Sequence, residues 1–118
     1  MVSDPRALVE TVVRAADDVK GFDIVVLDIS QITTFSDYFV IISGRSTTHV
    51  KAIADRIRDY AGREGVRASR REGYDEGRWI LLDYDDVVVH VFLDSERAFY
   101  NLERLWGDAP VVDVPANL

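Results

Sequence analysis

One short turn has the residue types for phosphate chemistry. The segment Ser43-Gly-Arg-Ser46 stands between an apolar run typical of a strand and a segment with helical periodicity. Backbone N–H groups at a helix N-terminus can bind phosphate, so this turn is a candidate nucleotide site. Nucleotidyl transfer also needs carboxylates on neighbouring strands to hold magnesium, but Asp83, Asp85 and Asp86 crowd a hairpin turn, and the next strand carries His90 instead. A residual nucleotide-binding or nucleotidyltransferase domain therefore stays as an alternative hypothesis.

The histidines and serines do not form a recognisable metal or hydrolase motif. The chain has two histidines and no cysteine, and it contains no HExxH or ExxH pattern. His49 falls in the first turn of an expected helix, and His90 falls within a strand as a half-buried or interface residue. Neither Ser43 nor Ser46 lies in a GxSxG elbow. We expect no metal, no cofactor and no catalytic triad.

Charged side chains gather in two parts of the chain. An acidic group flanks Trp79 and Tyr84, and acidic side chains around an exposed aromatic are ingredients of a protein–protein hot spot. A basic group nearby either touches a phosphate backbone at the edge of an interface or is simply solvated. The acidic residues are Asp75, Glu76, Asp83, Asp85 and Asp86, and the basic residues are Arg63, Arg67, Arg70, Arg71 and Arg78.

The elements that must position these residues follow from hydrophobic periodicity and from helix-start and helix-stop residues. Three helices and five strands are expected in the order α-β-β-α-β-β-β-α, which predicts one α/β domain with a mixed sheet. The first helix is expected from Pro5 towards Gly21, and the second from a cap at Ser46–Thr48 to Gly62 or Gly65. The third helix begins at Asp94 or Ser95, and its apolar side consists of Phe99, Leu102, Leu105 and Trp106. The strands are Ile24–Leu27, Tyr38–Ser43, the weaker Val66–Ser69, Trp79–Asp83 and Val87–Leu93. Residues 1–106 would form the domain, and residues 107–118 would form a C-terminal tail.

Length and charge restrict the class of function. The 118 residues, 13.3 kDa, suit one domain, and the net charge of −7 argues against free nucleic acid as the main partner. The absence of cysteine suits a reducing compartment, and the longest apolar runs are too short for a membrane span. The first residues resemble neither a secretory signal nor a transit peptide, so we expect a cytoplasmic protein.

Six segments, taken in order, resemble the ribosomal silencing factor family, the bacterial relatives of the plant Iojap protein. The resemblance covers roughly residues 6–106. Any one segment would be a weak signal, and their shared order is what makes the match specific. The segments are Asp23–Asp28, Phe35–Ser46 continuing through His49–Ala54, Glu76–Trp79, Leu82–Tyr84, Asp86–Phe92, and Arg97 with Tyr100–Trp106.

The resemblance implies a fold, a partner and a mechanism. Family members are small α/β domains, nucleotidyltransferase-like without the catalytic carboxylates, and they are homodimers when free. They bind large-subunit ribosomal protein number fourteen on the intersubunit face, block subunit joining and lower translation under nutrient limitation. Organellar relatives act in large-subunit assembly, so a large-subunit assembly factor is a further alternative. The resemblance therefore implies a steric repressor and not an enzyme.

The matching positions suggest three sets of roles. One departure stands out, because Asp85 occupies a turn position where many relatives carry Gly, which tolerates positive φ better. Partner contacts are assigned to Trp79, Asp83, Tyr84, Asp86, His90 and Tyr100. The residues assigned to closing the strand-to-helix turn are Asp37, Ser43, Gly44 and Ser46. Peripheral contact with ribosomal RNA is assigned to Arg70 and Arg71.

Overall fold

The computed structural model describes residues 4–100 and 109–114, with the side chains of residues 98–100 outside the described set. Its elements follow the predicted order and add one short strand at the end. Within the described ranges no helix is both long and apolar enough to span a bilayer. The elements are α1 (Pro5–Asp18), β1 (Phe22–Asp28), β2 (Tyr38–Gly44), α2 (Thr47–Arg63), β3 (Arg70–Glu72), β4 (Trp79–Asp83), β5 (Val87–Leu93), α3 (Asp94–Tyr100) and β6 (Val111–Val112).

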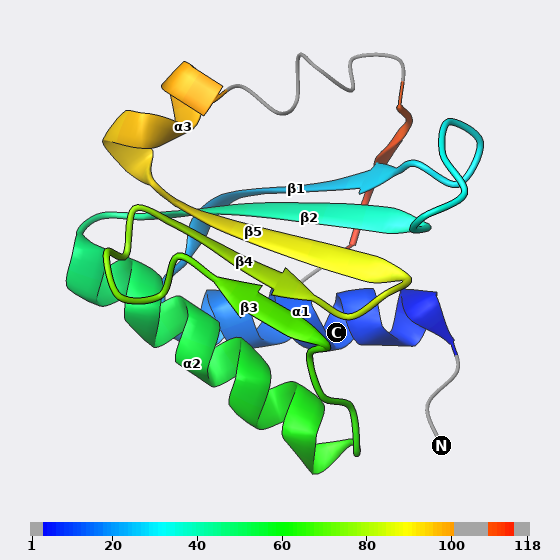
Figure 1. Ribbon diagram of the computed structural model, residues 1–118, viewed down its shortest axis with the longest axis horizontal. Helices are drawn as coiled ribbons and strands as arrows, with labels where there is room; N and C mark the ends of the chain where they lie inside the picture. The colour runs from blue at the N-terminus through cyan, green and yellow to red at the C-terminus, as the bar shows by residue number, and fades with distance from the viewer. Residues whose placement is uncertain (1–3, 101–108, 115–118) are drawn as a thin grey trace.

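The strands form one mixed sheet in the order β3-β4-β5-β2-β1-β6. The central pair, β2 and β5, is parallel, in register from Tyr38 opposite Val87 to Gly44 opposite Leu93. All the other pairs are antiparallel. Helices α1 and α2 cover one face of this sheet, and α3 lies on the other side, directly after β5 (Figure 1). The predicted α/β class with a mixed sheet is therefore confirmed.

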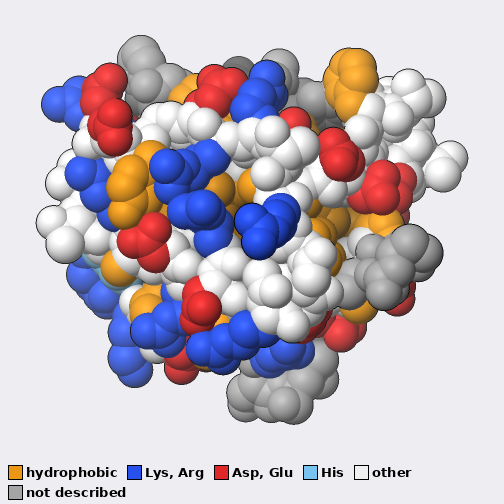
Figure 2. Space-filling view, turned by 60° about the horizontal axis from the view of Figure 1, so that its bottom comes forward, with side chains coloured by type: hydrophobic (Ala, Val, Ile, Leu, Met, Phe, Trp, Pro, Cys, Tyr) orange, Lys and Arg blue, Asp and Glu red, His pale blue; other side chains and the backbone are white. Residues whose placement is uncertain are grey.

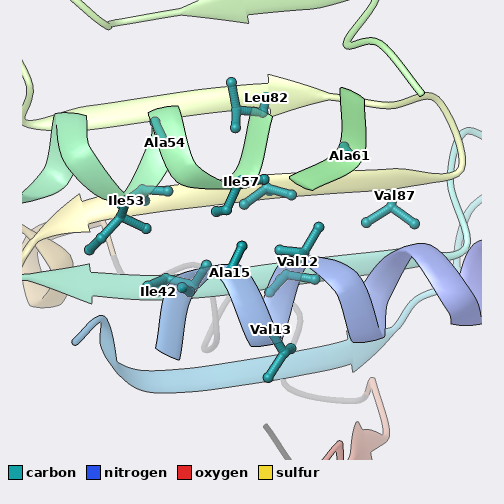
Figure 3. Packing of buried hydrophobic residues seen from close by; sticks show 14 of the residues in the cluster. Val12, Val13, Ala15, Ile42, Ile53, Ala54, Ile57, Ala61, Leu82 and Val87 are labelled. Atoms are coloured by element: carbon teal, nitrogen blue, oxygen red, sulfur yellow. The ribbon is translucent and has the colours of Figure 1, made fainter. Parts of the chain in front are cut away.

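Both long helices begin at polar caps and bury one apolar stripe. The Asp4 carboxylate accepts a hydrogen bond from the backbone N–H of Arg6 at 3.0 Å, and Pro5 occupies the first helical position. Ser46 caps α2 in the same way, because its hydroxyl accepts from the N–H of His49 at 3.1 Å. Figure 3 shows the two stripes meeting over the sheet, with Val12, Val13, Ala15, Ile53, Ala54, Ile57 and Ala61 from the helices against Ile42, Leu82 and Val87.

Alternation along β5 divides the sheet into two different faces. Val87, Val89 and Val91 point into the core under the helices, where all three are fully buried. The residues between them point to the opposite face, because successive strand side chains alternate. His90 and Phe92 therefore belong to a second, smaller cluster on the side away from α1 and α2.

Two strands differ from the prediction. The weak candidate Val66–Ser69 is not a strand; pairing begins at Arg70 opposite Asp83, and Val66 and Ala68 pack against the core instead. The last residues expected to be a tail include β6, which pairs antiparallel with β1. Ala109 is buried in the smaller cluster, and the carbonyl of Pro110 accepts from the N–H of Asp28 at 2.9 Å.

The turn between β4 and β5 has the left-handed backbone that the Asp85 position suggested. Asp85 has φ +69°, and its N–H donates to the Asp83 carboxylate at 2.9 Å. The N–H of Asp86 donates to the carbonyl of Tyr84 at 2.9 Å, and the Ser69 hydroxyl donates to the Asp85 carboxylate at 3.2 Å. Aspartate tolerates this conformation better than most residues do, but glycine occupies it without a steric penalty.

Replacing Asp85 should therefore change stability according to backbone freedom. We expect Asp85→Gly to leave the free energy of unfolding unchanged or to raise it by up to about 1 kcal/mol, because relief at the backbone offsets the exposed bond to Ser69. Asp85→Val should lower it by about 1–2 kcal/mol, since β-branched residues are strained at positive φ. Urea unfolding measures both, and a valine variant as stable as the parent would contradict the account.

Candidate functional site

The sheet face turned away from α1 and α2 carries an aromatic cluster, Phe39, Trp79, His90 and Phe92. Trp79 comes from β4 and lies opposite Phe92 of β5, and the Trp79 and Phe92 rings stack with centroids 5.0 Å apart. Phe39 of β2 meets the His90 ring edge-on at 4.9 Å. Trp79 and Phe39 are half-buried, whereas His90 and Phe92 are buried behind them. The cluster therefore presents part of a tryptophan and part of a phenylalanine to the surface.

His90 holds the exposed tryptophan in place. The indole N–H of Trp79 donates to Nδ1 of His90 at 3.1 Å, so the imidazole is a neutral ring protonated at Nε2. Burial lowers the pKa of His90 to about 4, and the carboxylate of Asp83 opposes this only weakly. Nε2 is buried and has no hydrogen-bond partner within the described residues. His90 thus lies behind Trp79 as a neutral positioning group.

An acidic turn and an exposed phenylalanine lie at one end of this face. Asp83 is about one-quarter exposed and pairs with Arg70 at 3.7 Å, while Asp85 and Asp86 are exposed. The Ser36 hydroxyl donates to the carbonyl of Asp85 at 2.5 Å, which brings the loop before β2 against the turn. Phe35 of that loop is 81% exposed. Sequence reasoning missed Phe35 because it stood in a polar stretch interpreted only as a connection.

Two of the predicted contact residues need separate comment. Tyr84 is only 6% exposed and packs in the main core on the helix side of the sheet, so the structure separates it from Trp79. Tyr84 continues the alternation of β4, so its ring lies on the same side as Ile80 and Leu82, and a partner contact at Tyr84 stays a prediction. Tyr100 is the last residue of α3, and its side chain lies outside the described set. The predicted apolar side of the last helix lies outside it as well.

The strand-to-helix turn is filled by its own interactions. Nδ1 of His49 accepts from the N–H of Arg45 at 2.9 Å, and Nε2 lies 2.7 Å from the carbonyl of Val19, which ties the end of α1 to the start of α2. The Ser43 hydroxyl is buried and accepts from Arg97 at 2.8 Å. A Cβ on Gly44 would lie 2.8 Å from Cγ2 of Val50, so this position needs glycine for packing.

Asp37 forms hydrogen bonds through its backbone at the start of β2. Its N–H donates to the carbonyl of Asp86 at 2.8 Å, and its own carbonyl accepts from the N–H of Ile29 at 2.9 Å. The loop before β2 and the hairpin after β4 are therefore linked at the start of the parallel pair. Asp37 lies at this end of β2, and Ser43, Gly44 and Ser46 lie at the other.

Comparison with known proteins gives a consistent result. The family described as ribosomal silencing factor during starvation matches residues 2–118. The ribosomal silencing factor of Bacillus subtilis is 46% identical over 109 residues, 92% of each chain. The chain belongs to the ribosomal silencing factor family. The chloroplastic Iojap protein of Zea mays is 34% identical over 102 residues, which is 86% of this chain and 44% of the plant protein.

Solved structures support the same family fold. A crystal structure from Bacillus halodurans superposes with a TM-score of 0.83 at 42% identity, covering 92% of this chain and 99% of that one. One from Chromobacterium violaceum gives 0.87 at 34% identity, covering 98% and 97%. The architecture described above is therefore that of the solved relatives.

The nucleotidyltransferase alternative lacks an assembled site in this member of the silencing factor family. Gly44 lies at the end of β2 and Asp86 directly precedes β5, and the parallel register places these positions at opposite ends of the central pair. Seven residues of strand separate them by roughly 20 Å. No group of three or more metal-binding side chains occurs among the residues that the structure describes. The turn and the carboxylates cannot act on one substrate in this arrangement.

The buried neutral His90 should make this protein sensitive to acid. Its folded pKa of about 4 lies below the usual 6.5, so the unfolded chain binds the proton more tightly, and stability falls as pH drops through this window. We expect a loss of about 3 kcal/mol between pH 6.5 and 4 that His90→Phe lacks. Urea unfolding across this range measures the difference. Trp79→Phe, which keeps the histidine, should retain most of the loss, and superimposable pH curves for the parent and His90→Phe would refute the assignment.

Proposed function

We propose that this protein binds the large ribosomal subunit through its protein number fourteen, on the face that meets the small subunit. Bound there, it blocks subunit joining and represses translation. The observation that supports this most directly is the match to the silencing factor family over residues 2–118, since the curated relatives carry the name ribosomal silencing factor. The mechanism is steric exclusion and requires no catalysis, so we propose that the protein is not an enzyme.

The aromatic cluster face is the proposed docking surface. Trp79 is a half-buried aromatic held by stacking and by a hydrogen bond, and such preorganised tryptophans are typical hot-spot residues. Asp83 and Asp86 add negative charge at the opposite end of the same face, since Trp79 lies opposite Phe92 and Asp83 lies opposite Val88. This charge would attract and orient a basic ribosomal protein. His90 contributes by fixing Trp79. Phe35 joins the proposed surface because it is exposed next to the acidic turn.

The remaining assignments of the proposal concern the edges of the molecule. Tyr100 stays a proposed contact because α3 follows β5 on the side of the aromatic cluster. Arg70 and Arg71 are exposed on the edge strand β3, where ribosomal RNA contact is proposed. The free protein is proposed to be a cytoplasmic homodimer. If the dimer uses the docking face, it must dissociate before the ribosome binds.

Sedimentation tests the proposal directly. The purified protein is mixed with isolated large and small subunits under conditions that permit joining and is separated on a sucrose gradient. We expect co-migration with the large subunit and fewer joined ribosomes. A protein that stays at the top of the gradient, or that moves with the small subunit, would overturn the proposed function.

Truncation of Trp79 should weaken binding to the large subunit strongly. We expect Trp79→Ala to reduce affinity by on the order of 2 kcal/mol or more, because it removes a central aromatic contact. Trp79→Phe is the second variant in case the alanine variant does not fold. It keeps a stacked ring, so it should bind the large subunit with intermediate affinity. Tyr60→Ala serves as the control, since Tyr60 lies on α2 at the opposite face. Unchanged binding by a folded Trp79→Ala protein would remove Trp79 from the interface.

Phe35 allows the docking surface to be tested without disturbing the packing of the core. Because its ring is 81% exposed, Phe35→Ala should leave stability within about 0.5 kcal/mol of the parent. We expect large-subunit affinity to fall by about 1 kcal/mol or more. Tyr60→Ala is again the control, because Tyr60 lies on α2 at the opposite face of the sheet. Equal affinities for the two variants would exclude Phe35 from the docking surface.

A further inference from the structure

A cavity on the helix side of the sheet is surrounded by arginines. It has a volume of about 270 Å³ and lies between the second half of α2, the connection that follows it, and β3. Tyr84, otherwise packed in the core, contributes to its lining. The lining residues are Arg58, Gly62, Val66, Arg67, Ala68, Arg71 and Tyr84.

The three arginines of this cavity have no carboxylate partner within 4.0 Å in the described part of the chain. Neighbouring arginines that do not line it are paired: Arg63 binds Asp59 at 2.8 Å, and Arg70 lies 3.2 Å from Glu72. Arg58, Arg67 and Arg71 thus bring three positive charges to one cavity in a protein of net charge −7. Like charges held together are unfavourable unless an anion neutralises them.

Figure 2 views the molecule from the side of the long helices and shows Lys and Arg side chains grouped on this face. Their concentration here contrasts with the acidic composition of the whole chain. A guanidinium group presents several N–H donors in a fixed plane, which suits the oxygens of phosphate. The charge and the donor geometry of the cavity are therefore those of a phosphate site.

One contact and one protonation state prepare the cavity for an anion. The guanidinium of Arg71 lies 4.4 Å from the centre of the Tyr74 ring, and this cation–π contact restrains the side chain without neutralising its charge. Burial raises the pKa of Tyr84, so its hydroxyl stays protonated and able to donate. The cavity volume is below the range of roughly 300–1,000 Å³ that encloses a drug-sized ligand, so it suits a phosphate chain better than a whole nucleotide.

We propose that Arg58, Arg67 and Arg71, with the hydroxyl of Tyr84, form a binding site for the phosphate groups of a polyanionic ligand. The rest of the ligand would remain in solvent. The site lies on the opposite face of the sheet from Trp79, so it can be occupied while the proposed docking face holds its partner. Two sources share this chemistry: the polyphosphate of a free nucleotide and the backbone of ribosomal RNA.

Binding to the full-length protein tests the site. Binding of tripolyphosphate and of ATP is measured by the shift in melting temperature and by calorimetry. Binding of a fluorescent single-stranded RNA is measured by fluorescence anisotropy. We expect a raised melting temperature or a saturable anisotropy change. Arg58→Gln and Arg67→Gln should each weaken binding about tenfold or more, because a charge-assisted contact is lost. Arg63→Gln is the matched control, since Arg63 is exposed on α2 but paired and outside the cavity.

The outcomes separate the two sources. If the parent protein binds tripolyphosphate and ATP but not RNA, and the cavity variants lose this binding, the ligand is a free nucleotide polyphosphate. RNA binding lost in the same variants, without tripolyphosphate binding, supports an RNA backbone, and loss of both supports a general phosphate site. No saturable binding of any probe overturns the proposal, as does an equal loss in Arg63→Gln, which would indicate unspecific attraction. These results do not depend on subunit sedimentation, so the two proposals fail independently.

Discussion

The parallel pairing of β2 and β5 at the centre of the sheet is the constraint on which the rest of the structure depends. Its register places Gly44 beside Leu93 at one end and Tyr38 beside Val87 at the other. Parallel strands must be joined by a crossover, and α2, β3 and β4 supply it. Because the crossover returns through two antiparallel strands, the hairpin carrying Asp85 lies at the start of β5, far from the turn before α2.

This placement explains why the glycine turn and the acidic hairpin do not form one nucleotidyltransferase site in the described part of the chain. A catalytic arrangement would need carboxylates near the helix that follows the glycine turn. Here the Arg97 guanidinium donates a hydrogen bond to the Ser43 hydroxyl, and the N–H of Arg45 donates one to Nδ1 of His49. These groups of the turn therefore already have partners within the chain. The acidic residues are instead at the other end, exposed and next to Phe35. Their position suits attraction of a basic surface better than metal binding.

Local patterns predicted the elements well, because each depended on residues close in sequence. The caps at Asp4 and Ser46, the apolar stripes of α1 and α2, and the positive φ at Asp85 follow from side-chain chemistry within a few residues. β6 was missed because two residues carry no periodicity, and its pairing with β1 is a tertiary interaction. β3 was misplaced by a few residues because its position depends on pairing with Asp83 and its neighbours.

The candidate site was only partly predictable for the same reason. The sequence placed Trp79 and His90 on strands, but not the hydrogen bond between them, which depends on the β4–β5 register. Tyr84 was proposed as a contact without considering its face; alternation along β4 places its ring with Ile80 and Leu82 on the helix side. The arginine cavity joins a helix, a connection and an edge strand, so its members looked like a scattered solvated group.

The two faces of the sheet therefore present surfaces of opposite character. The aromatic cluster face combines an apolar centre with carboxylates at its end, whereas the helix side carries three guanidinium groups around a cavity that have no carboxylate partner among the described residues. A basic protein and a phosphate ligand would each be attracted to one of these surfaces and repelled by the other. In the proposed complex the carboxylates would face the basic protein, whereas Arg58, Arg67 and Arg71 would face phosphate, so the two interactions would not compete for the same side chains.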